Sequence, residues 1–247
     1  MRIKLIACNV FSRELYDVSA HSPHIFETSF LALGLHNYPD KLREEIQSLI
    51  DSTDPALFDV IVLGYGLCSR ATAGIEAKNI PIVIPKAHDC ITLLLGSRER
   101  YTREFNAHPG TYYYSPGWVE RKTEEVDQLT NISKEKLYDV KYKEYVEKYG
   151  EDNAKYLLDM ECTWMDHYER VAFINMGIGN IKEYRRFTQE LAKERGWMWD
   201  EIQGDKTILE MISSANWDPE YFEIINPGDK IAESYDENII CSSNCSE

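Results

Sequence analysis

Three short apolar runs in the first part of the chain are each followed by a cysteine. The runs are Ile3–Ala7, Val60–Leu63 and Ile80–Ile84, and the cysteines are Cys8, Cys68 and Cys90. Short apolar runs of this length are typical of buried strands in a parallel sheet. Because ligands of open α/β sheets bind outside the carboxyl ends of the strands, we expect the three sulfur atoms to gather at one edge of the sheet.

The alternation of strand-like and helix-like segments predicts an α/β fold, with a parallel sheet, helices on both faces and right-handed crossovers. Two similar Rossmann-like lobes are a further organisation that this order allows. A helix is expected from Pro39, because proline suits a first helical turn and the apolar residues that follow recur at every third or fourth position. The other elements expected in the first half are strands at 3–8, 59–63, 81–84 and 111–114, a short helix at 69–78 and a helix from 91 through 105.

The second half carries fewer strand signals, and residues 11–36 show no clear period, so we expect that segment to be irregular. Later elements are expected as helices at 133–149 and 151–167, a strand at 171–175, a helix at 181–195, a short run at 197–199, a helix at 205–214 and a strand at 222–225. We therefore divide the chain into an α/β lobe with the cysteine motifs, a helical connector, a second α/β portion and a polar, cysteine-containing tail, over 1–118, 119–168, 169–235 and 236–247.

Composition limits the classes of function. The 247 residues carry a formal net charge of −15, which opposes binding to nucleic acid, since a phosphate backbone requires clustered Lys and Arg. No run of about 20 apolar residues is present to span a membrane. The first residues lead straight into a strand pattern rather than a signal peptide. We therefore expect a soluble, cytoplasmic protein without nucleic-acid or membrane partners.

In a cytoplasmic chain, cysteines indicate metal ligands, redox groups or buried apolar residues rather than a disulfide framework. Cys90 belongs to the sequence His88-Asp89-Cys90, so an imidazole and a thiolate lie two residues apart. Soft thiolate and imidazole ligands suit zinc or an iron centre. Cys8, Cys68, His88 and Cys90 are therefore the predicted metal ligands. A zinc site with three protein ligands would leave one coordination position for substrate.

Other roles exist for these residues. A single cysteine after a strand is often a small buried residue, and Asp89 is expected to cap the helix that begins after it. Three cysteines from three loops could also hold a [4Fe–4S] cluster with one iron open to substrate. Cys162 is expected in a helical core, whereas Cys241 and Cys245 lie in a polar tail and are not expected to bind metal.

Two glycine-rich turns follow expected strands, at Gly64-Tyr65-Gly66 and Gly177-Ile178-Gly179. Gly64 and Gly66 are the candidate cofactor-binding residues, because a phosphate can bind where such a turn leads into a helix. Neither turn has the full GxGxxG pattern, so tight turning alone is the alternative explanation. The histidines of the irregular segment, His21, His24 and His36, are expected to be exposed or hydrogen-bonded.

Several stretches of the chain resemble a family of uncharacterised archaeal and bacterial proteins that share one domain of unknown function, and the likeness covers most of residues 1–230. The stretches are Leu5–Cys8, Gly34–Asn37, Leu63–Cys68, His88–Ile91, Leu95–Tyr101, Pro109–Tyr113 and Pro116–Trp118. Some members are encoded near corrinoid-dependent methyltransferases of anaerobes, so the resemblance implies one-carbon metabolism. Locally, His88-Asp89-Cys90 is similar to the His-x-Cys pair of zinc enzymes that methylate thiols, although here the other cysteines precede the pair.

These observations together predict a metal-thiolate protein with an open zinc site, and a metal-dependent methyl- or sulfur-group transferase is the enzyme class we consider. Its expected setting is anaerobic, corrinoid-linked methyl metabolism, with a small molecule such as a thiol as substrate and a corrinoid protein as partner. The alternatives are a [4Fe–4S] enzyme, a non-catalytic accessory protein that carries a metal or a corrinoid, and a chain whose cysteines are structural.

Overall fold

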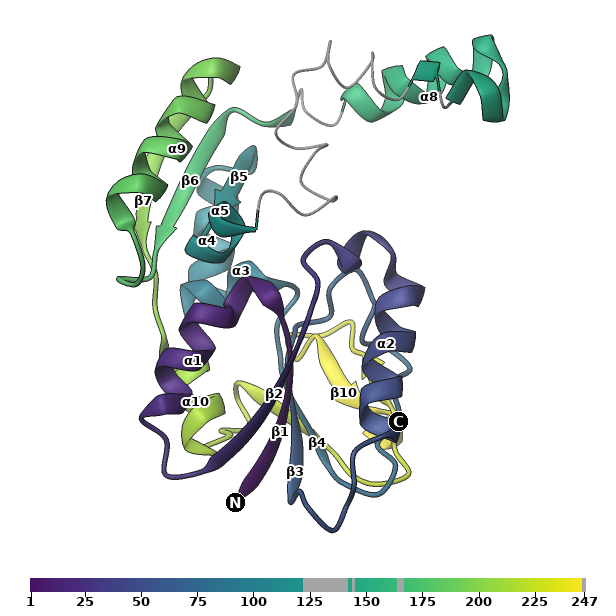
Figure 1. Ribbon diagram of the computed structural model, residues 1–247, viewed down its shortest axis with the longest axis vertical. Coiled ribbons are helices and arrows are strands. Elements are labelled where there is room, and N and C mark those ends of the chain that lie inside the picture. The colour runs from purple at the N-terminus through teal and green to yellow at the C-terminus, as the bar shows by residue number, and fades with distance from the viewer. Residues whose placement is uncertain (122–141, 144, 164–166, 246–247) are drawn as a thin grey trace.

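The structure, a computed structural model, describes residues 1–121, 142–143, 145–163 and 167–245. These residues form a mixed α/β fold in two lobes, each built around its own sheet (Figure 1). The predicted α/β class is therefore confirmed. No helix in the described ranges is both long enough and apolar enough to cross a membrane.

The first lobe contains a five-stranded sheet in the order β2-β1-β3-β4-β8. Four strands are parallel, and β8 runs antiparallel beside β4. The apolar runs noted above form β1, β3 and β4, and almost every residue in them is buried, as in a sheet covered on both faces. The strands are β1 (Arg2–Cys8), β2 (Ile25–Leu31), β3 (Val60–Gly64), β4 (Ile82–Pro85) and β8 (Phe222–Ile225).

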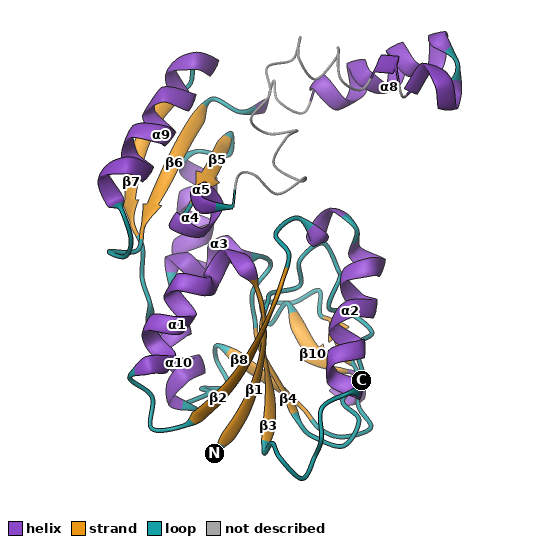
Figure 2. Cartoon of the chain, viewed as in Figure 1, coloured by secondary structure: helices purple, strands orange, loops and turns teal. Residues whose placement is uncertain are grey.

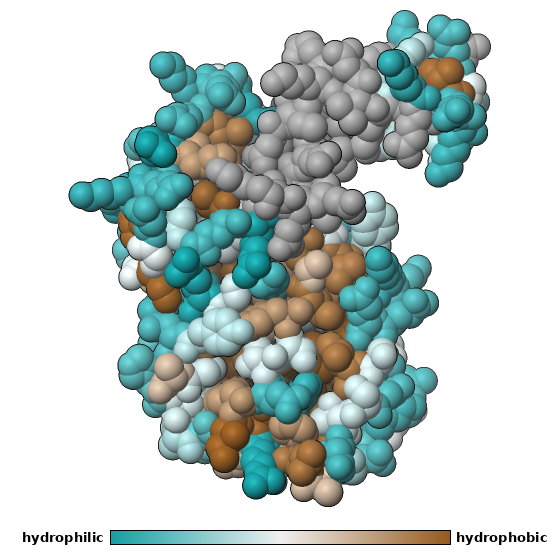
Figure 3. All heavy atoms as spheres, viewed as in Figure 1, coloured by the Kyte–Doolittle hydropathy of each residue, from teal (hydrophilic) through white to brown (hydrophobic). Residues whose placement is uncertain are grey.

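Helices lie on both sides of this sheet (Figure 2). One side carries α1 (Ser12–Ala20) and α10 (Thr207–Ser214), which contact each other, and the other carries α2 (Pro39–Asp51). α2 begins at the predicted proline, and its three buried residues recur every four positions, so a single apolar face packs inward. On the face in Figure 3, hydrophilic residues cover the α2 side and apolar residues gather toward the middle of the molecule.

The second lobe is a smaller parallel sheet in the order β5-β6-β7, with α9 packed against β6 and β7. Its own core contains Tyr114, Phe173 and Tyr184, whose aromatic side chains are almost fully buried. The elements of this lobe are β5 (Thr111–Tyr114), α5 (Pro116–Glu120), β6 (Arg170–Asn175), α9 (Ile181–Arg195) and β7 (Met198–Gln203); α8 (Glu151–Thr163) lies between α5 and β6 in the sequence.

The chain crosses between the lobes twice, and the crossings lie side by side. On the way out, α3 (Cys90–Leu95) ends at Gly96, and α4 (Arg98–Ala107) leads into the second lobe. On the way back, the amide of Asp205 donates to the carbonyl of Leu94 at 2.9 Å. Gly96 has φ +79°, and a Cβ there would lie 2.5 Å from Cγ of Asp205. Glycine thus allows both the turn and the close approach of the returning chain.

This topology corrects the predicted boundaries. Residues 111–114 were expected as a fourth strand of the first sheet, but they pair with β6 in the second, so the first lobe does not extend to residue 118. The second α/β portion, expected over 169–235, is divided between the two lobes, because α10 and β8 belong to the first lobe. The tail also has structure: β9 (Ile231–Glu233) and β10 (Ile240–Ser242) form an antiparallel pair, followed by a short 3₁₀ turn, η5 (Ser243–Cys245).

Two local predictions were wrong, a third was partly wrong, and a fourth falls mostly outside the described residues. Residues 11–36 are not irregular, because they contain α1 and β2. Residues 69–78 are not helical, because the chain after β3 makes a left-handed turn instead. The expected helix from 91 through 105 is interrupted at Gly96. Most of the helix expected at 133–149 lies outside the described residues, whereas α8 lies within the expected 151–167.

Candidate functional site

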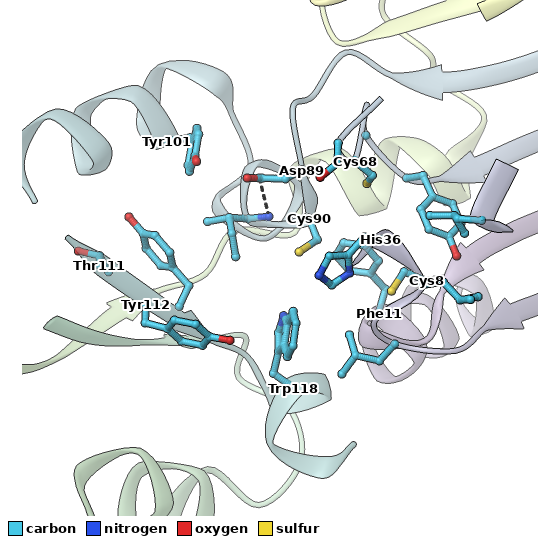
Figure 4. A pocket seen from close by; sticks show the side chains of 18 of the residues that line it. Cys8, Phe11, His36, Cys68, Asp89, Cys90, Tyr101, Thr111, Tyr112 and Trp118 are labelled. Carbon is cyan, nitrogen blue, oxygen red and sulfur yellow. Dashed lines mark hydrogen bonds between the residues drawn. The ribbon is translucent and has the colours of Figure 1, made fainter. Parts of the chain in front are cut away.

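A cavity of about 410 Å³ lies at the carboxyl ends of β1, β3 and β4, and residues of α4, β5 and α5 line its other side. Cysteines and a histidine line one end of it, and aromatic side chains line the other (Figure 4). The residues with chemical groups in its wall are Cys8, His36, Tyr65, Cys68, Ser69, Asp89, Cys90, Tyr101, Thr111, Tyr112, Tyr113, Trp118 and Tyr168.

Cys8 is the last residue of β1, and it is 8% exposed. Its strand is central in the sheet, with β2 on one side and β3 on the other. The chain turns immediately into a short 3₁₀ segment, η1 (Asn9–Phe11), so the sulfur stays at the strand end. The predicted position of Cys8 at the carboxyl edge of a buried strand is therefore what the structure shows.

Cys68 begins an unusual turn after β3. Cys68, Ser69 and Arg70 have φ of 47°, 55° and 67°, three successive left-handed residues without a glycine. Each such residue costs on the order of 1–3 kcal/mol, so the surrounding structure must hold the turn in place. The hydroxyl of Thr72, which is fully buried, donates to the carbonyl of Gly66 at 3.1 Å. Arg70 also pairs with Glu233 at 2.9 Å.

Cys90 is the first residue of α3, and Asp89 caps that helix as predicted. The Asp89 Oδ1 atom accepts hydrogen bonds from the amides of Ile91 at 3.0 Å and Thr92 at 3.2 Å. In Figure 4 the indole nitrogen of Trp118 faces the Cys90 sulfur, and this N–H favours the thiolate. The contact lacks hydrogen-bond geometry, so we describe it as electrostatic.

Burial controls the protonation of the thiols. The pKa of Cys68 is raised to about 12, mainly by desolvation and in smaller part by the nearby Cys8 and Asp89. Desolvation also raises the pKa of Cys90 well above its usual range, with added contributions from Asp89, Cys8 and Cys68. Cys8 thus raises the pKa of both other thiols, and Cys68 raises that of Cys90. As they stand, Cys68 and Cys90 are protonated at neutral pH and are poor nucleophiles.

The imidazole of the site is not the predicted one. His88 is exposed and does not line the cavity, so the structure does not bring its ring to the three cysteines. His36, in the short segment η2 (Leu35–Asn37), lies in the cavity wall near Cys8 and Cys90 (Figure 4). Burial lowers the pKa of His36, against the opposing effect of Asp89, and so favours the neutral ring, which is the form that binds metals.

The two candidate glycines are explained by packing. A Cβ on Gly64 would lie 2.6 Å from Cβ of Ala7, and one on Gly66 would lie 2.5 Å from the carbonyl oxygen of Ala87. Gly66 lines the cavity and Gly64 does not. Tight packing of β3 against its neighbours therefore accounts for both residues, and their binding of a cofactor stays an untested prediction.

The remaining cysteines lie elsewhere. Cys241 is in β10 and does not line the cavity. Cys162 is within α8 and Cys245 ends η5, and their side chains lie outside the described part of the structure. Within the described part of the chain, no group of three or more His, Cys, Asp or Glu side chains is arranged to hold a metal ion.

The aromatic side chains at the other end of the cavity were not predicted from the sequence. Tyr101 and Phe105 come from α4, which bridges the lobes, and Tyr112 and Trp118 come from the second lobe. Three buried polar atoms in the wall have no hydrogen-bond partner within the described structure: Oη of Tyr65, Oη of Tyr113 and Nε1 of Trp118. Buried polar atoms are usually satisfied, so these point to a ligand or water in the cavity.

The site thus defines an α/β protein with a thiol-lined and aromatic-lined cavity between two lobes. The sequence model of one family, described as "Protein of unknown function (DUF1638)", matches residues 30–212, and the chain belongs to that family. No curated protein and no solved structure matches the chain. The functional argument therefore depends on the chemistry of the cavity.

Proposed function

We propose that this chain is a metal-thiolate protein, in which Cys8, Cys68 and Cys90 bind zinc at the base of the cavity and leave the metal open toward a small molecule. The observation that carries the proposal is that three cysteines, from the carboxyl ends of three neighbouring parallel strands, line one cavity, although the described side chains are not gathered around a common metal position in this structure. Thiolates are soft ligands, so three cysteines delivered to one wall by three separate strand ends suit a soft metal.

The protonation of the thiols supports this proposal. Without a cation, burial keeps Cys68 and Cys90 neutral. A bound divalent ion reverses that preference, because its charge stabilises the thiolates. A thiol that acted as a nucleophile on its own would need a positive neighbour, and the wall, all within the described residues, contains no Lys or Arg.

His36 and Asp89 have supporting roles in this proposal. The neutral imidazole of His36 is the ring available to the site, either as a further ligand or as a hydrogen-bond partner of a ligand. Asp89 fixes the start of α3 and hence the position of Cys90. When bound, zinc supplies Lewis-acid polarisation or activation of a thiol, and the resemblance noted above supports a setting in corrinoid-linked methyl metabolism.

Metal analysis of anaerobically purified protein tests the proposal. We expect about one zinc per chain and no visible absorbance. Broad visible absorbance with iron and sulfide would instead identify the alternative, a [4Fe–4S] cluster on the same three cysteines. Metal content at background level in protein expressed with either metal would refute both.

Two serine variants locate the metal. Cys90→Ser should lose it while keeping a wild-type circular dichroism spectrum, because a hydroxyl of similar size is a poor ligand for soft metals. Cys241→Ser, in β10 and outside the cavity wall, is the matched control and should keep the metal. Equal metal content in Cys90→Ser and wild type would remove Cys90 from the site.

A further inference from the structure

We propose that the aromatic end of the cavity binds a methylated onium group, an ammonium or sulfonium centre that carries methyl groups, on a small-molecule substrate. The inference rests on the proposed function, because it names the substrate class of that same cavity. The volume is the first observation: about 410 Å³ lies within the range of roughly 300–1,000 Å³ typical of small-molecule sites, so a metal ion leaves most of it for a ligand.

Aromatic faces supply the second observation. Tyr101, Tyr112 and Trp118 are arranged around the open part of the cavity (Figure 4). Tyr112 is held between Tyr114 and Tyr168, with ring centroids 5.2 Å and 5.3 Å away, which fixes the ring before any ligand binds. Faces of Trp and Tyr attract cations, and several of them around one space are the usual means of binding quaternary ammonium.

Charge is the third observation. The wall holds the carboxylate of Asp89 and no Lys or Arg among its residues, all of which are described. The guanidinium of Arg170 lowers the pKa of Tyr113, but Arg170 is already paired with Asp200 at 2.5 Å and with Glu104 at 3.4 Å. Zinc with three thiolates would carry a charge of about −1, so the loaded site still favours a cation.

The type of cation follows from the hydrogen-bonding groups. A primary ammonium needs acceptors for three N–H donors. The unpartnered polar atoms of the wall are the indole N–H of Trp118, which only donates, and the hydroxyls of Tyr65 and Tyr113, which give two acceptors rather than three; Oδ1 of Asp89 already accepts from two backbone amides. A methylated onium has no N–H to satisfy, and its methyl groups suit aromatic faces. This set of groups therefore favours the methylated form.

Calorimetric titration of the full-length protein, as purified with its metal, tests the inference. The probes are choline and dimethylbutanol, in which a quaternary carbon replaces the nitrogen, so that they differ in charge but hardly in shape. We expect choline to bind at least about tenfold more tightly than its neutral isostere, since only the cation gains from the aromatic faces. Equal affinities, or no choline binding at millimolar concentration, would overturn the proposal.

Two variants show where the probe binds. Trp118→Leu removes an aromatic face and should weaken choline binding about tenfold or more. Tyr235→Leu removes an aromatic ring that is 89% exposed and lies outside the cavity wall, and this control should bind choline within about twofold of wild type. Wild-type affinity in Trp118→Leu, with its fold intact by circular dichroism, would refute the assignment. Metal content measured on the same samples separates the two proposals. Protein that holds metal but does not prefer choline supports the metal site alone, whereas protein that prefers choline but holds no metal supports the onium site alone.

Discussion

The backbone amide of Cys68 donates a hydrogen bond to the carbonyl oxygen of His88 at 2.8 Å. Together with the bond from the Leu67 amide to the Ala87 carbonyl, also 2.8 Å, it extends the pairing of β3 and β4 beyond the ends of both strands. The loops that carry Cys68 and Cys90 are therefore fixed to each other. His88 contributes its backbone to this arrangement while its side chain is exposed.

The first prediction separates the two histidines. His36→Ala should weaken metal binding about 10- to 100-fold, the usual effect of removing a ligand's neighbour or a weak ligand. His88→Ala is the control and should bind within about twofold of wild type, because the substitution keeps the carbonyl that Cys68 uses. Metal affinity from competition with a chromophoric chelator measures both. A larger loss in His88→Ala than in His36→Ala would restore the His-x-Cys prediction.

The second prediction concerns Gly66. Gly66→Ala should place a methyl group 2.5 Å from the Ala87 carbonyl oxygen and push apart the two cysteine loops. We expect a loss of about 1–3 kcal/mol in the free energy of unfolding, together with reduced metal content. Gly196→Ala is a matched control, because Gly196 has φ +68° but open space around it. The variant should lose about 1 kcal/mol in the free energy of unfolding and keep its metal. Normal metal content in Gly66→Ala would show that the loops adapt.

The third prediction separates the two roles of Asp89. Asp89→Asn keeps an oxygen that can cap α3, so its unfolding free energy should stay within about 0.5 kcal/mol of wild type, whereas Asp89→Ala should lose about 0.5–2 kcal/mol. Both variants remove the carboxylate and should weaken choline binding alike. Urea unfolding and calorimetry measure the two effects. Unchanged choline affinity in Asp89→Asn would exclude the charge from ligand binding.

Much of the fold could be predicted because buried parallel strands leave unbroken apolar runs. β1, β3 and β4 follow from such runs, and α9 from its regular period. β2 was missed because it is an edge strand, with mostly half-buried or exposed residues. α1 was missed because a carboxylate, Glu14, lies on its buried face. No local pattern could show that β5 pairs with the second sheet, since pairing partners depend on contacts far apart in sequence.

The positions of the cysteines and the capping role of Asp89 could be predicted from the sequence, whereas His36 and the aromatic side chains of the cavity could not. Strand ends place Cys8, Cys68 and Cys90 by a rule that needs only the order of elements. His36 was assigned to an irregular segment, and its position depends on the loop after β2, which sequence periodicity does not fix. Trp118 reaches the cavity only because the second lobe packs against the first. The one available signal was that these residues fall in the stretches that carry the family resemblance.

Glu14 is the most unusual ionisable group outside the cavity. Its side chain is fully buried in α1, and neither carboxylate oxygen has a hydrogen-bond partner in the described structure. Burial is the main cause that raises its pKa to about 7; its own backbone amide, Lys206 and Arg13 oppose the rise, and nearby Glu120 adds to it. Glu120 belongs to the second lobe and pairs with Arg13 at 2.6 Å, so the buried acid lies where the lobes meet.

The fourth prediction is the pH dependence that Glu14 imposes. Below about pH 4.5 the carboxyl is protonated in both the folded and unfolded chain, and it has no effect on their balance. As the pH rises toward 7, the unfolded chain releases this proton and the folded chain retains it, so stability falls. Above pH 7 the loss reaches about 3 kcal/mol, at about 1.4 kcal/mol for each pKa unit.

Glu14→Gln removes this titration. We expect urea unfolding to show that the free energy of unfolding of the variant, relative to wild type, rises by about 2–3 kcal/mol from pH 5 to pH 8. Any cost of the neutral amide itself is the same at both pH values and cancels. Glu44→Gln, at an exposed position on α2, removes a carboxylate of the same kind from the surface and serves as the control. A difference between Glu14→Gln and wild type that stays constant from pH 5 to pH 8 would show that Glu14 ionises normally in the folded chain. Such a result would mean that water reaches the Glu14 carboxylate, although α1 is packed against its neighbours there.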